Sequence, residues 1–397
     1  MIPRPAILSA SLPTPLRYAA IFYLLHILCQ GWIGSSQGFL ALSLFAAIVS
    51  IRRGDLSVVA HPLSFPLALF LVGSTVSAFA APNPVKSAFE VGEWFGFLVF
   101  PLALSLYQRI PDLDRLAFRC ILTLAYFLSL YGLFQYFILG HRDLEHRITG
   151  TTAHVMTYSG IILPISLLLL VFLLEKPDLV IAGATLLTSA VLVLTFTRGA
   201  WIGWLIGAAT LVLLRRSRWF FYGLPILVFA VTLSPLAIFG RLVSTFDMRQ
   251  SSNLDRVRMV EAGVEIIRDA PILGVGPSNI KEIYPLYRRE DAPRFRIPHL
   301  HNNFIQIWAE RGVVSVAAYL LLILMFLRQC GSIPRSNRAA RTFADAGIVT
   351  AVSLATAGLF EFNFGDSEVL LNMLDLFALV SFGIASAGRT APPSPAP

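Results

Sequence analysis

Two histidines and two asparagines stand together in the segment HLHNNFIQIWAERG, residues 299–312, directly before a long apolar run. An imidazole titrates near neutral pH, so a histidine can take a proton from a hydroxyl group and later release it. We therefore interpret His301 as a candidate catalytic base and His299 as a weaker candidate for substrate binding. The alternative is a helix-capping or interfacial polar residue, and it weighs more for His299 than for His301.

Further polar residues follow the histidines at helical spacing. Asn302 and Asn303 would ordinarily cap the helix that becomes the next apolar span. Gln306 and Glu310 come at i+4 and i+7 from this pair, on the same helix face. These side chains could hold a sugar hydroxyl or simply face water. We include Asn302 and Gln306 among the candidate substrate-binding residues.

Three arginines lie close to expected membrane boundaries in other segments: Arg147 in RITGTTAHVMTYSG, Arg198 in TFTRGAWIGW and Arg256 in DRVRMVEAGVEIIRD. Charges at membrane depth are costly and tend to face a bundle interior or a watery cavity. The guanidinium fork matches phosphate oxygens. The alternative is that these arginines snorkel to lipid phosphates. We predict that they bind a phosphate or diphosphate, which in a bilayer could be carried by a long lipid.

Acidic and turn-forming residues give weaker signals. The segment FEFNFGDSE carries Glu361, Asp366 and Glu368, which could orient a histidine or bind a cation but are more often solvated. No pair of aspartates of the DxD type accompanies the arginines, so we expect no metal and no cofactor. PILGVGPSN, residues 271–279, is expected to form a turn, with anion binding by the following helix N-terminus as the alternative.

The composition shows what must position these residues. The chain of 397 residues is 56% hydrophobic and 14% charged, with a mean hydropathy of +0.71. Soluble globular proteins contain about 25% charged residues, so we predict an all-α integral membrane protein. Three cysteines in separate apolar regions suggest neither a disulfide framework nor a zinc site. The net charge of +8 is spread over loops, which argues against a nucleic-acid partner.

About 20 apolar residues are needed for a helix to cross the hydrocarbon, and by that measure the sequence contains twelve candidate spans. The first is interpreted as a retained span, because no cleavage site of a signal peptide follows it. The expected spans are residues 15–34, 35–51, 64–82, 88–107, 116–139, 152–174, 179–196, 199–214, 219–239, 312–328, 342–362 and 368–387.

The distribution of lysine and arginine tests this count. Sixteen of the 31 lie on one side of the expected membrane, four lie in the short loops of the other, and the rest lie in the long segment 240–311. The positive-inside rule then places both termini in the cytoplasm and the long segment outside. We expect spans one to nine in 1–239, a periplasmic cap in 240–311, spans ten to twelve in 312–387 and a disordered cytoplasmic tail in 388–397.

Short helices are expected inside the cap, over residues 255–269 and 278–287. In the first of them, Val257, Val260, Val264 and Ile267 follow helical spacing and predict an apolar stripe. Arg256 lies about 60° from the centre of that stripe, at the edge that would meet the membrane. Glu90 and Glu93, in the outer half of the fourth span, remain without an assigned role.

The motifs resemble those of one known family. His301 and Asn302, followed by nine residues and Gly312, resemble the H[NSQ]x9Gxx[GTY] signature of bacterial O-antigen ligases, although Ser315 departs from its last position. These ligases share a superfamily with O-antigen polymerases and pilin O-oligosaccharyltransferases. Arg256 with Val260 is similar to the accompanying Rx3L element. RITGT at 147–151, TRGAW at 197–201 and PILGVG at 271–276 resemble the outward-facing segments of the superfamily, in the same order.

The resemblance implies a glycosyltransferase of the bacterial inner membrane with a periplasmic active site. Such an enzyme moves O-antigen polysaccharide from an undecaprenyl diphosphate donor to a lipid A-core acceptor, among membrane lipids. Arg147, Arg198 and Arg256 would hold the diphosphate, and His301 would take the proton of the acceptor hydroxyl. A single displacement would invert the anomeric centre without a metal.

Three other functions compete with this interpretation. An O-antigen polymerase uses the same donor but often carries two large outer loops, whereas one is expected here. A pilin oligosaccharyltransferase commonly carries larger outer domains. A twelve-span solute carrier belongs to a different class and would place ionisable residues near the bilayer midplane in both halves. The middles of the expected spans are nearly uncharged, which disfavours the carrier.

Overall fold

The computed structural model describes residues 12–215 and 251–390, and all regular structure in these two ranges is helical. The first range contains the helices α1 (Thr14–Leu28), α2 (Ile33–Arg52), α3 (Ser64–Ala80), α4 (Pro84–Gly92), η2 (Glu93–Leu98), α5 (Val99–Arg109), α6 (Leu113–Phe137), α7 (Val155–Glu175), α8 (Leu179–Leu194) and α9 (Arg198–Arg215). The second contains α12 (Ser251–Asp269), α13 (Ile280–Tyr287), α14 (Asn303–Gly331), α15 (Arg338–Ala357), η4 (Asn363–Gly365) and α16 (Ser367–Thr390).

The expected spans agree with this helix order. The span at 219–239 lies outside the described residues, and each of the others overlaps a helix. Six described segments are long and apolar enough to cross a membrane: Ile33–Arg52, Pro84–Arg109, Leu113–Phe137, Val155–Glu175, Asn303–Gly331 and Ser367–Gly388. The all-helical class is confirmed, whereas the count of twelve spans and the periplasmic position of the cap stay predictions.

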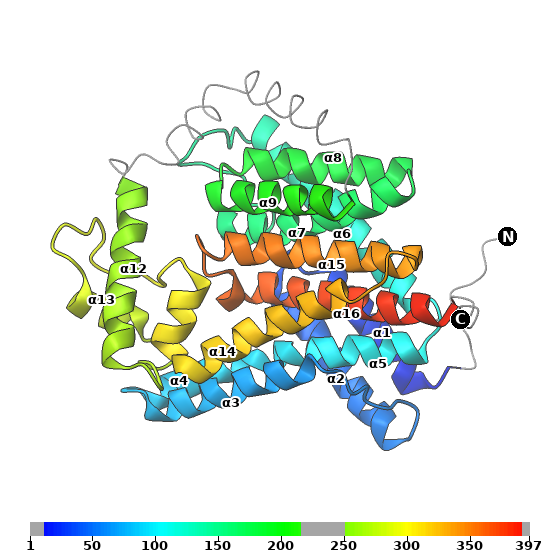
Figure 1. Ribbon diagram of the computed structural model, residues 1–397, viewed down its shortest axis with the longest axis horizontal. Coiled ribbons are helices and arrows are strands. Elements are labelled where there is room, and N and C mark those ends of the chain that lie inside the picture. Colours follow the sequence, from blue (N-terminus) through cyan, green and yellow to red (C-terminus); the bar gives the residue numbers. More distant parts are fainter. Residues whose placement is uncertain (1–11, 216–250, 391–397) are drawn as a thin grey trace.

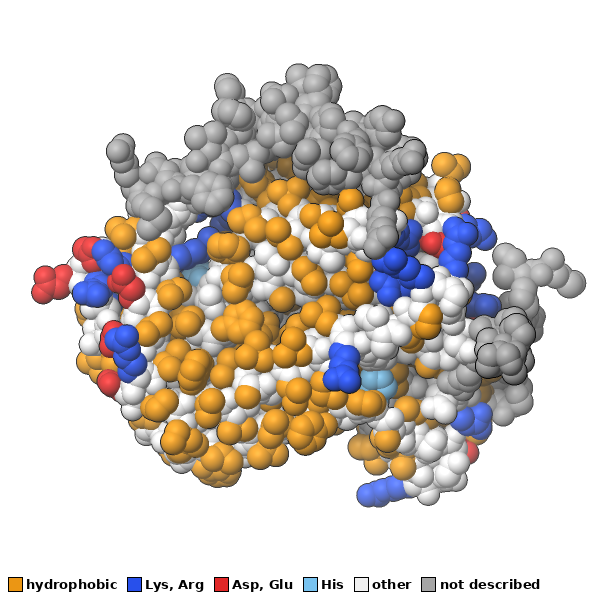
Figure 2. All heavy atoms as spheres, in the orientation of Figure 1, with side chains coloured by type: hydrophobic (Ala, Val, Ile, Leu, Met, Phe, Trp, Pro, Cys, Tyr) orange, Lys and Arg blue, Asp and Glu red, His pale blue; other side chains and the backbone are white. Residues whose placement is uncertain are grey.

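The helices pack into a bundle whose centre is formed by α7 and α16 (Figure 1). Within their apolar windows, 78% of α7 and 83% of α16 is buried, against 33% of α2. A helix that is hydrophobic on all sides is either buried among other helices or surrounded by lipid, and the burial of α7 and α16 places them among other helices. Figure 2 shows apolar side chains across the middle of one face and charged side chains gathered at the two ends of the bundle. This belt is what a bilayer-embedded bundle requires.

The cap lies at one end of this bundle, where α12 crosses the ends of the long helices (Figure 1). Its own small core includes Met259, Ala262 and Ile266 of α12. The buried face is rotated from the predicted stripe: Val257 is exposed, Val260 and Val264 are half-buried, and Ile267 packs against this core as predicted. The small residues at 262 and 263 explain the rotation, because they let α12 approach the start of α14 closely. A Cβ atom at Gly263 would lie only 2.3 Å from the Ile305 side chain.

A buried polar network joins α1, α5 and α16 inside the bundle. The Asp375 carboxylate faces His26 at 3.0 Å, accepts a hydrogen bond from Tyr23 at 2.9 Å and is contacted by Gln30. Tyr23 is in turn 2.7 Å from the hydroxyl of Tyr107. Buried polar groups need such partners, and here each satisfies another. His26 and Asp375 were not singled out from the sequence, although both lie within expected spans, at 15–34 and 368–387.

Candidate active site

The long helix α14 is broken at Gly312, about two and a half turns after it begins at Asn303. Gly312 has φ +72° and ψ −176°, a conformation that is essentially restricted to glycine. The break leaves carbonyl groups of the preceding turn without helical partners, and the loop 271–276 supplies amides to them. Val275 N donates to Ala309 O at 2.9 Å, and Gly276 N donates to Glu310 O at 2.8 Å. The PILGVG and HNx9G motifs thus pair through their backbones, and these two amides are not available to an anion.

The asparagines of the motif fix where α14 begins. Asn302 Oδ1 accepts hydrogen bonds from Phe304 N at 3.0 Å and Ile305 N at 3.1 Å, which is an N-cap. Its Nδ2 donates to Leu359 O at 3.1 Å. Asn303 ties the same turn to the loop before α16, since its Oδ1 accepts from Phe364 N. Both the amide oxygen and the amide nitrogen of Asn302 therefore bond to the protein itself.

Gln306 holds the histidine loop against α14. It is buried, and its Oε1 accepts a hydrogen bond from Leu300 N, between the two histidines, at 2.7 Å. His301 adopts a φ of +51°, which is uncommon for a residue with a side chain. Backbone strain of this kind persists where surrounding contacts enforce it, and it clusters at functional sites. The motif residues thus force the imidazole of His301 into one position.

Both histidines face the carboxylate of Glu361, in the loop between α15 and α16. His301 Nδ1 is 2.9 Å from Glu361 Oε2, and His299 Nδ1 is 3.6 Å from Oε1. The two imidazole rings are 4.2 Å apart. The side chains of His301 and Glu361 are each 13% exposed, so water screens their contact only partly. The sequence suggested a histidine-orienting role for Glu361 only as the less common alternative.

The contact determines how His301 can act. An ionised carboxylate only accepts hydrogen bonds, so the proton shared with Glu361 belongs to Nδ1 and the lone pair of Nε2 is left for a substrate. Burial would raise the pKa of Glu361, but the hydrogen bond from His301 and the charges around it outweigh burial and lower that pKa. Burial lowers the pKa of His299 to about 4, against an ordinary value of 6.5. His299 is therefore neutral at physiological pH.

Arg256 lies on the other flank of Glu361. Both residues line a narrow crevice with Ser159 of α7 and Thr197 and Gly199 at the start of α9. Burial lowers the pKa of Arg256, although the nearby charge of Glu361 opposes this effect. An arginine remains charged despite such a shift. Arg256 is therefore close to Glu361, the carboxylate that His301 contacts, whereas neither histidine is among the residues that line the crevice.

The other two predicted arginines have different surroundings. Arg198 is 5% exposed and donates to Ser252 Oγ at 3.1 Å and Asn253 Oδ1 at 2.6 Å, so it links the start of α9 to the first turn of α12. Arg147 is half-buried in the loop between α6 and α7 and is not among the residues that line the crevice. Figure 2 shows basic side chains beside a histidine between α12 and α9.

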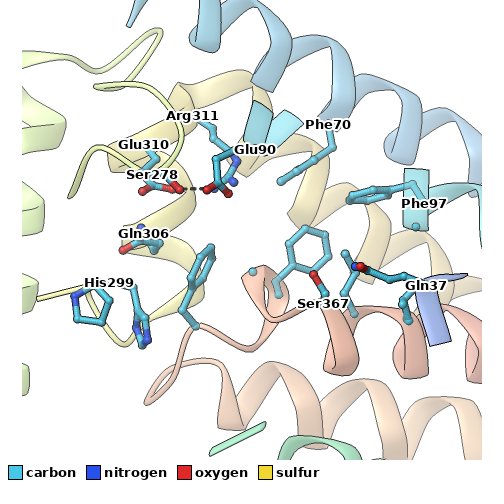
Figure 3. Close-up of a pocket in the computed structure, with 17 residues that line it drawn as sticks. Gln37, Phe70, Glu90, Phe97, Ser278, His299, Gln306, Glu310, Arg311 and Ser367 are labelled. Atoms are coloured by element: carbon cyan, nitrogen blue, oxygen red, sulfur yellow. Dashed lines mark hydrogen bonds and ion pairs between the residues drawn. The ribbon is translucent and has the colours of Figure 1, made fainter. Parts of the chain in front are cut away.

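A separate cavity of about 180 Å³ lies beside His299 (Figure 3). His299 and Gln306 line it, together with Glu90 of α4 and the buried pair of Glu310 and Arg311. Arg311 Nη1 is 2.8 Å from Glu310 Oε2. Arg311 was not predicted as a site residue from the sequence, and Glu90 had no predicted role. The available signal was the presence of adjacent charges directly before an apolar span.

The histidines and Glu361 are also a possible metal-binding set. Their ligand atoms lie within 4.8 Å of one another. Imidazole nitrogen and carboxylate oxygen are ligands that zinc accepts. The direct hydrogen bond between His301 and Glu361 is an alternative use of the same atoms, and we favour it as the arrangement of the active protein.

Comparison with known proteins bears on the identity of the chain. Residues 183–329 match a family model described as O-antigen ligase. The matched region runs from within α8 to near the end of α14, and it includes Arg198, Arg256, His299 and His301. Among curated proteins, none matches the chain. Over residues 183–329, the chain is therefore similar to the O-antigen ligase family.

Proposed function

We propose that the chain is an O-antigen ligase, which transfers polysaccharide from undecaprenyl diphosphate to a lipid A-core acceptor. The superfamily itself is one of membrane glycosyltransferases. In this proposal the protein spans the bacterial inner membrane many times with both termini in the cytoplasm, and the cap and the histidines face the periplasm. The observation that carries the proposal is the position of Glu361, which contacts His301 and lines a crevice together with Arg256.

The reaction is a single displacement at the anomeric carbon of the donor. Nε2 of His301 takes the proton of the acceptor hydroxyl while the oxygen of that hydroxyl forms a bond to the anomeric carbon. The bond from the carbon to the diphosphate oxygen breaks, and the electron pair leaves with undecaprenyl diphosphate. The anomeric centre is inverted, and the imidazolium later releases its proton to water. Glu361 stabilises the positive charge that His301 gains in the transition state.

Arginine supplies the complementary charge for the leaving group. Negative charge grows on the diphosphate as the sugar departs, and a preorganised guanidinium stabilises that charge. Arg256 is placed for this role because it lines the crevice next to Glu361. We assign Arg198 to positioning, since its bonds fix the helix that carries Arg256. Arg147 stays in the proposal as a residue that binds the diphosphate from the loop before α7.

The proposed mechanism needs neither a metal nor a cofactor. Diphosphate is already a good leaving group once guanidinium groups neutralise it, and His301 has a carboxylate partner in place of a cation. Transfer in the presence of a chelator tests this part of the proposal. A reaction that stops with chelator and returns with zinc would instead assign His299, His301 and Glu361 to a metal.

A reconstituted transfer reaction tests the function as a whole. The full chain in detergent or liposomes is given a lipid diphosphate-linked glycan, with rough lipopolysaccharide as the acceptor. We expect ligated product that depends on the acceptor. Elongation of the donor in the absence of lipopolysaccharide would instead identify a polymerase, and transport without transfer would identify a carrier.

A variant of the base adds a residue-level test. His301→Ala should lower kcat by about 10²- to 10⁴-fold, the usual contribution of a positioned base, and should leave donor binding intact. His146→Ala is the matched control, because this histidine is 69% exposed in the loop before α7. Full turnover by His301→Ala would exclude it as the base.

A further inference from the structure

The cavity of about 180 Å³ beside His299 has a lining suited to a single sugar ring. A cavity of about 150 Å³ is known to hold one benzene molecule, so this space accommodates one six-membered ring. Phe70 and Phe97 contribute apolar walls, and their rings stack on each other at 5.6 Å. Figure 3 shows these rings on one side and the polar side chains of Glu90, Gln306 and Glu310 on another. A sugar has an apolar ring face, which can pack against the phenyl rings, and hydroxyl groups, which can bond to the polar side chains.

The polar groups of the cavity divide into satisfied and available ones. Glu310 is bound by Arg311 and receives further hydrogen bonds from Gln306 and the Ser278 backbone. Glu90 is half-buried and its charge attracts Arg311, but among the described residues it forms no ion pair within 4 Å, and it lines the cavity. A carboxylate accepts hydrogen bonds at both oxygens, so Glu90 can accept from the hydroxyl groups of a ligand in the cavity.

The cavity and the Arg256 crevice are separated by one short segment of chain. Phe360, Glu361 and Asn363 line the crevice, whereas Phe362 and Phe364 line the cavity. The segment 360–364 therefore forms a partition, and the histidines stand at its edge. In an inverting displacement the attacking hydroxyl and the leaving diphosphate lie on opposite faces of the anomeric carbon. The two substrates must therefore meet at the edge of this segment, where His301 contacts Glu361, with the diphosphate on the side of Arg256 and the acceptor sugar on the side of the cavity.

We infer that the cavity lined by Glu90, Gln306, Glu310 and Arg311 is the acceptor subsite, which holds one pyranose ring with its attacking hydroxyl toward the histidines. The inference rests on the proposed function, because it names where the second substrate binds. The side chains in the cavity carry two carboxylates and one guanidinium. An uncharged sugar is therefore preferred over an anionic one such as a uronic acid.

Direct binding tests the subsite without relying on transfer. Saturation-transfer NMR is recorded on the full chain with methyl glucoside or methyl glucuronide as the probe. We expect a signal from methyl glucoside and a much weaker one from methyl glucuronide. Glu90→Gln leaves one carboxylate and one guanidinium in the cavity. The difference in signal between methyl glucoside and methyl glucuronide should therefore shrink. Glu265→Gln, on the exposed face of α12, is the matched control and should keep it.

A second variant fills the space instead of changing its charge. Leu370 lines the cavity from α16, and Leu370→Phe should remove the glucoside signal. Leu324→Phe makes the same change on the outer face of α14, where the side chain is 62% exposed, and should bind as the wild type does. Equal signals from both probes and from every variant would overturn the inference.

Kinetics then identify whose sugar the cavity holds. Glu90→Gln should raise the KM for rough lipopolysaccharide by about tenfold, the effect of losing one charge-assisted hydrogen bond, with the donor KM unchanged. A change confined to the donor KM would overturn the acceptor assignment. If the wild type binds methyl glucoside but transfers nothing, the proposed function fails while the sugar site remains. If it transfers but no cavity variant changes binding or KM, the subsite alone fails.

Discussion

Replacing Glu361 by glutamine removes the negative charge that faces His301 and keeps the size of the side chain. The contact to Nδ1 is 2.9 Å long, and each partner is 13% exposed, so this is a charge-assisted hydrogen bond with limited screening. Bonds to charged groups contribute about 1.5 to 3 kcal/mol. If the transition state feels the whole of this contribution, kcat falls by about 10- to 150-fold, since about 1.4 kcal/mol is a factor of ten.

The assay is single-turnover transfer from a labelled lipid diphosphate-linked glycan, which separates chemistry from product release. Asp366→Asn serves as the control, because it removes a carboxylate from the same loop that is bonded to Thr157. The double variant Glu361→Gln with His301→Ala should be no slower than His301→Ala, since the two residues act as one unit. A Glu361→Gln enzyme with the wild-type rate, or a double variant slowed by both factors, would refute the coupling of Glu361 to the base.

Three further predictions follow from the same geometry. Arg256→Ala should raise the donor KM and lower kcat, together by about 10²- to 10³-fold in kcat/KM, with the acceptor KM unchanged. Gly312→Ala should destabilise the fold by more than about 2 kcal/mol, because the φ of Gly312 is +72° and a Cβ atom there would lie 1.9 Å from Ile272 O. Gly331→Ala is the control, since a Cβ atom at Gly331 meets nothing within 4 Å. Thermal unfolding of the two variants measures the difference. Burial lowers the pKa of His299 from 6.5 to about 4, so the unfolded chain binds a proton more readily than the folded one between these two pH values. The free energy of unfolding should therefore fall by up to about 3 kcal/mol as the pH drops through this range. His299→Gln should make the free energy of unfolding depend less on pH over the same range.

The helices were predictable from the sequence because membrane spans leave a strong signal. Apolar runs of the required length recur along the chain, and each described run became a helix. The rotation of α12 was not predictable from periodicity, because valines suggested one face while small residues created another. Ala262 and Gly263 are buried since they permit close packing against α14, and a hydrophobicity pattern does not register that advantage.

The candidate site was predictable in part. His301 and Arg256 were singled out by residue type and position, and the structure places both next to Glu361. The partnership itself joins residues 60 positions apart, and only the folded chain brings them together. Asn302 shows the reverse case, because its cap reduces the functional importance that its place in the motif suggested. No role for Glu90 was predictable from the sequence, because the cavity that it lines is formed by residues far apart along the chain.

The broken turn at Gly312 has a consequence for how the enzyme can diversify. The cap is aligned with the bundle by main-chain atoms, namely the amides of Val275 and Gly276 and the carbonyls of Ala309 and Glu310. Amides and carbonyls are the same whatever side chain they carry. Substitutions at the exposed Ile272 can therefore reshape the outer surface and leave the imidazole where it is. In the proposed transfer reaction, the rim that meets the substrates can thus change in shape while the base keeps its position.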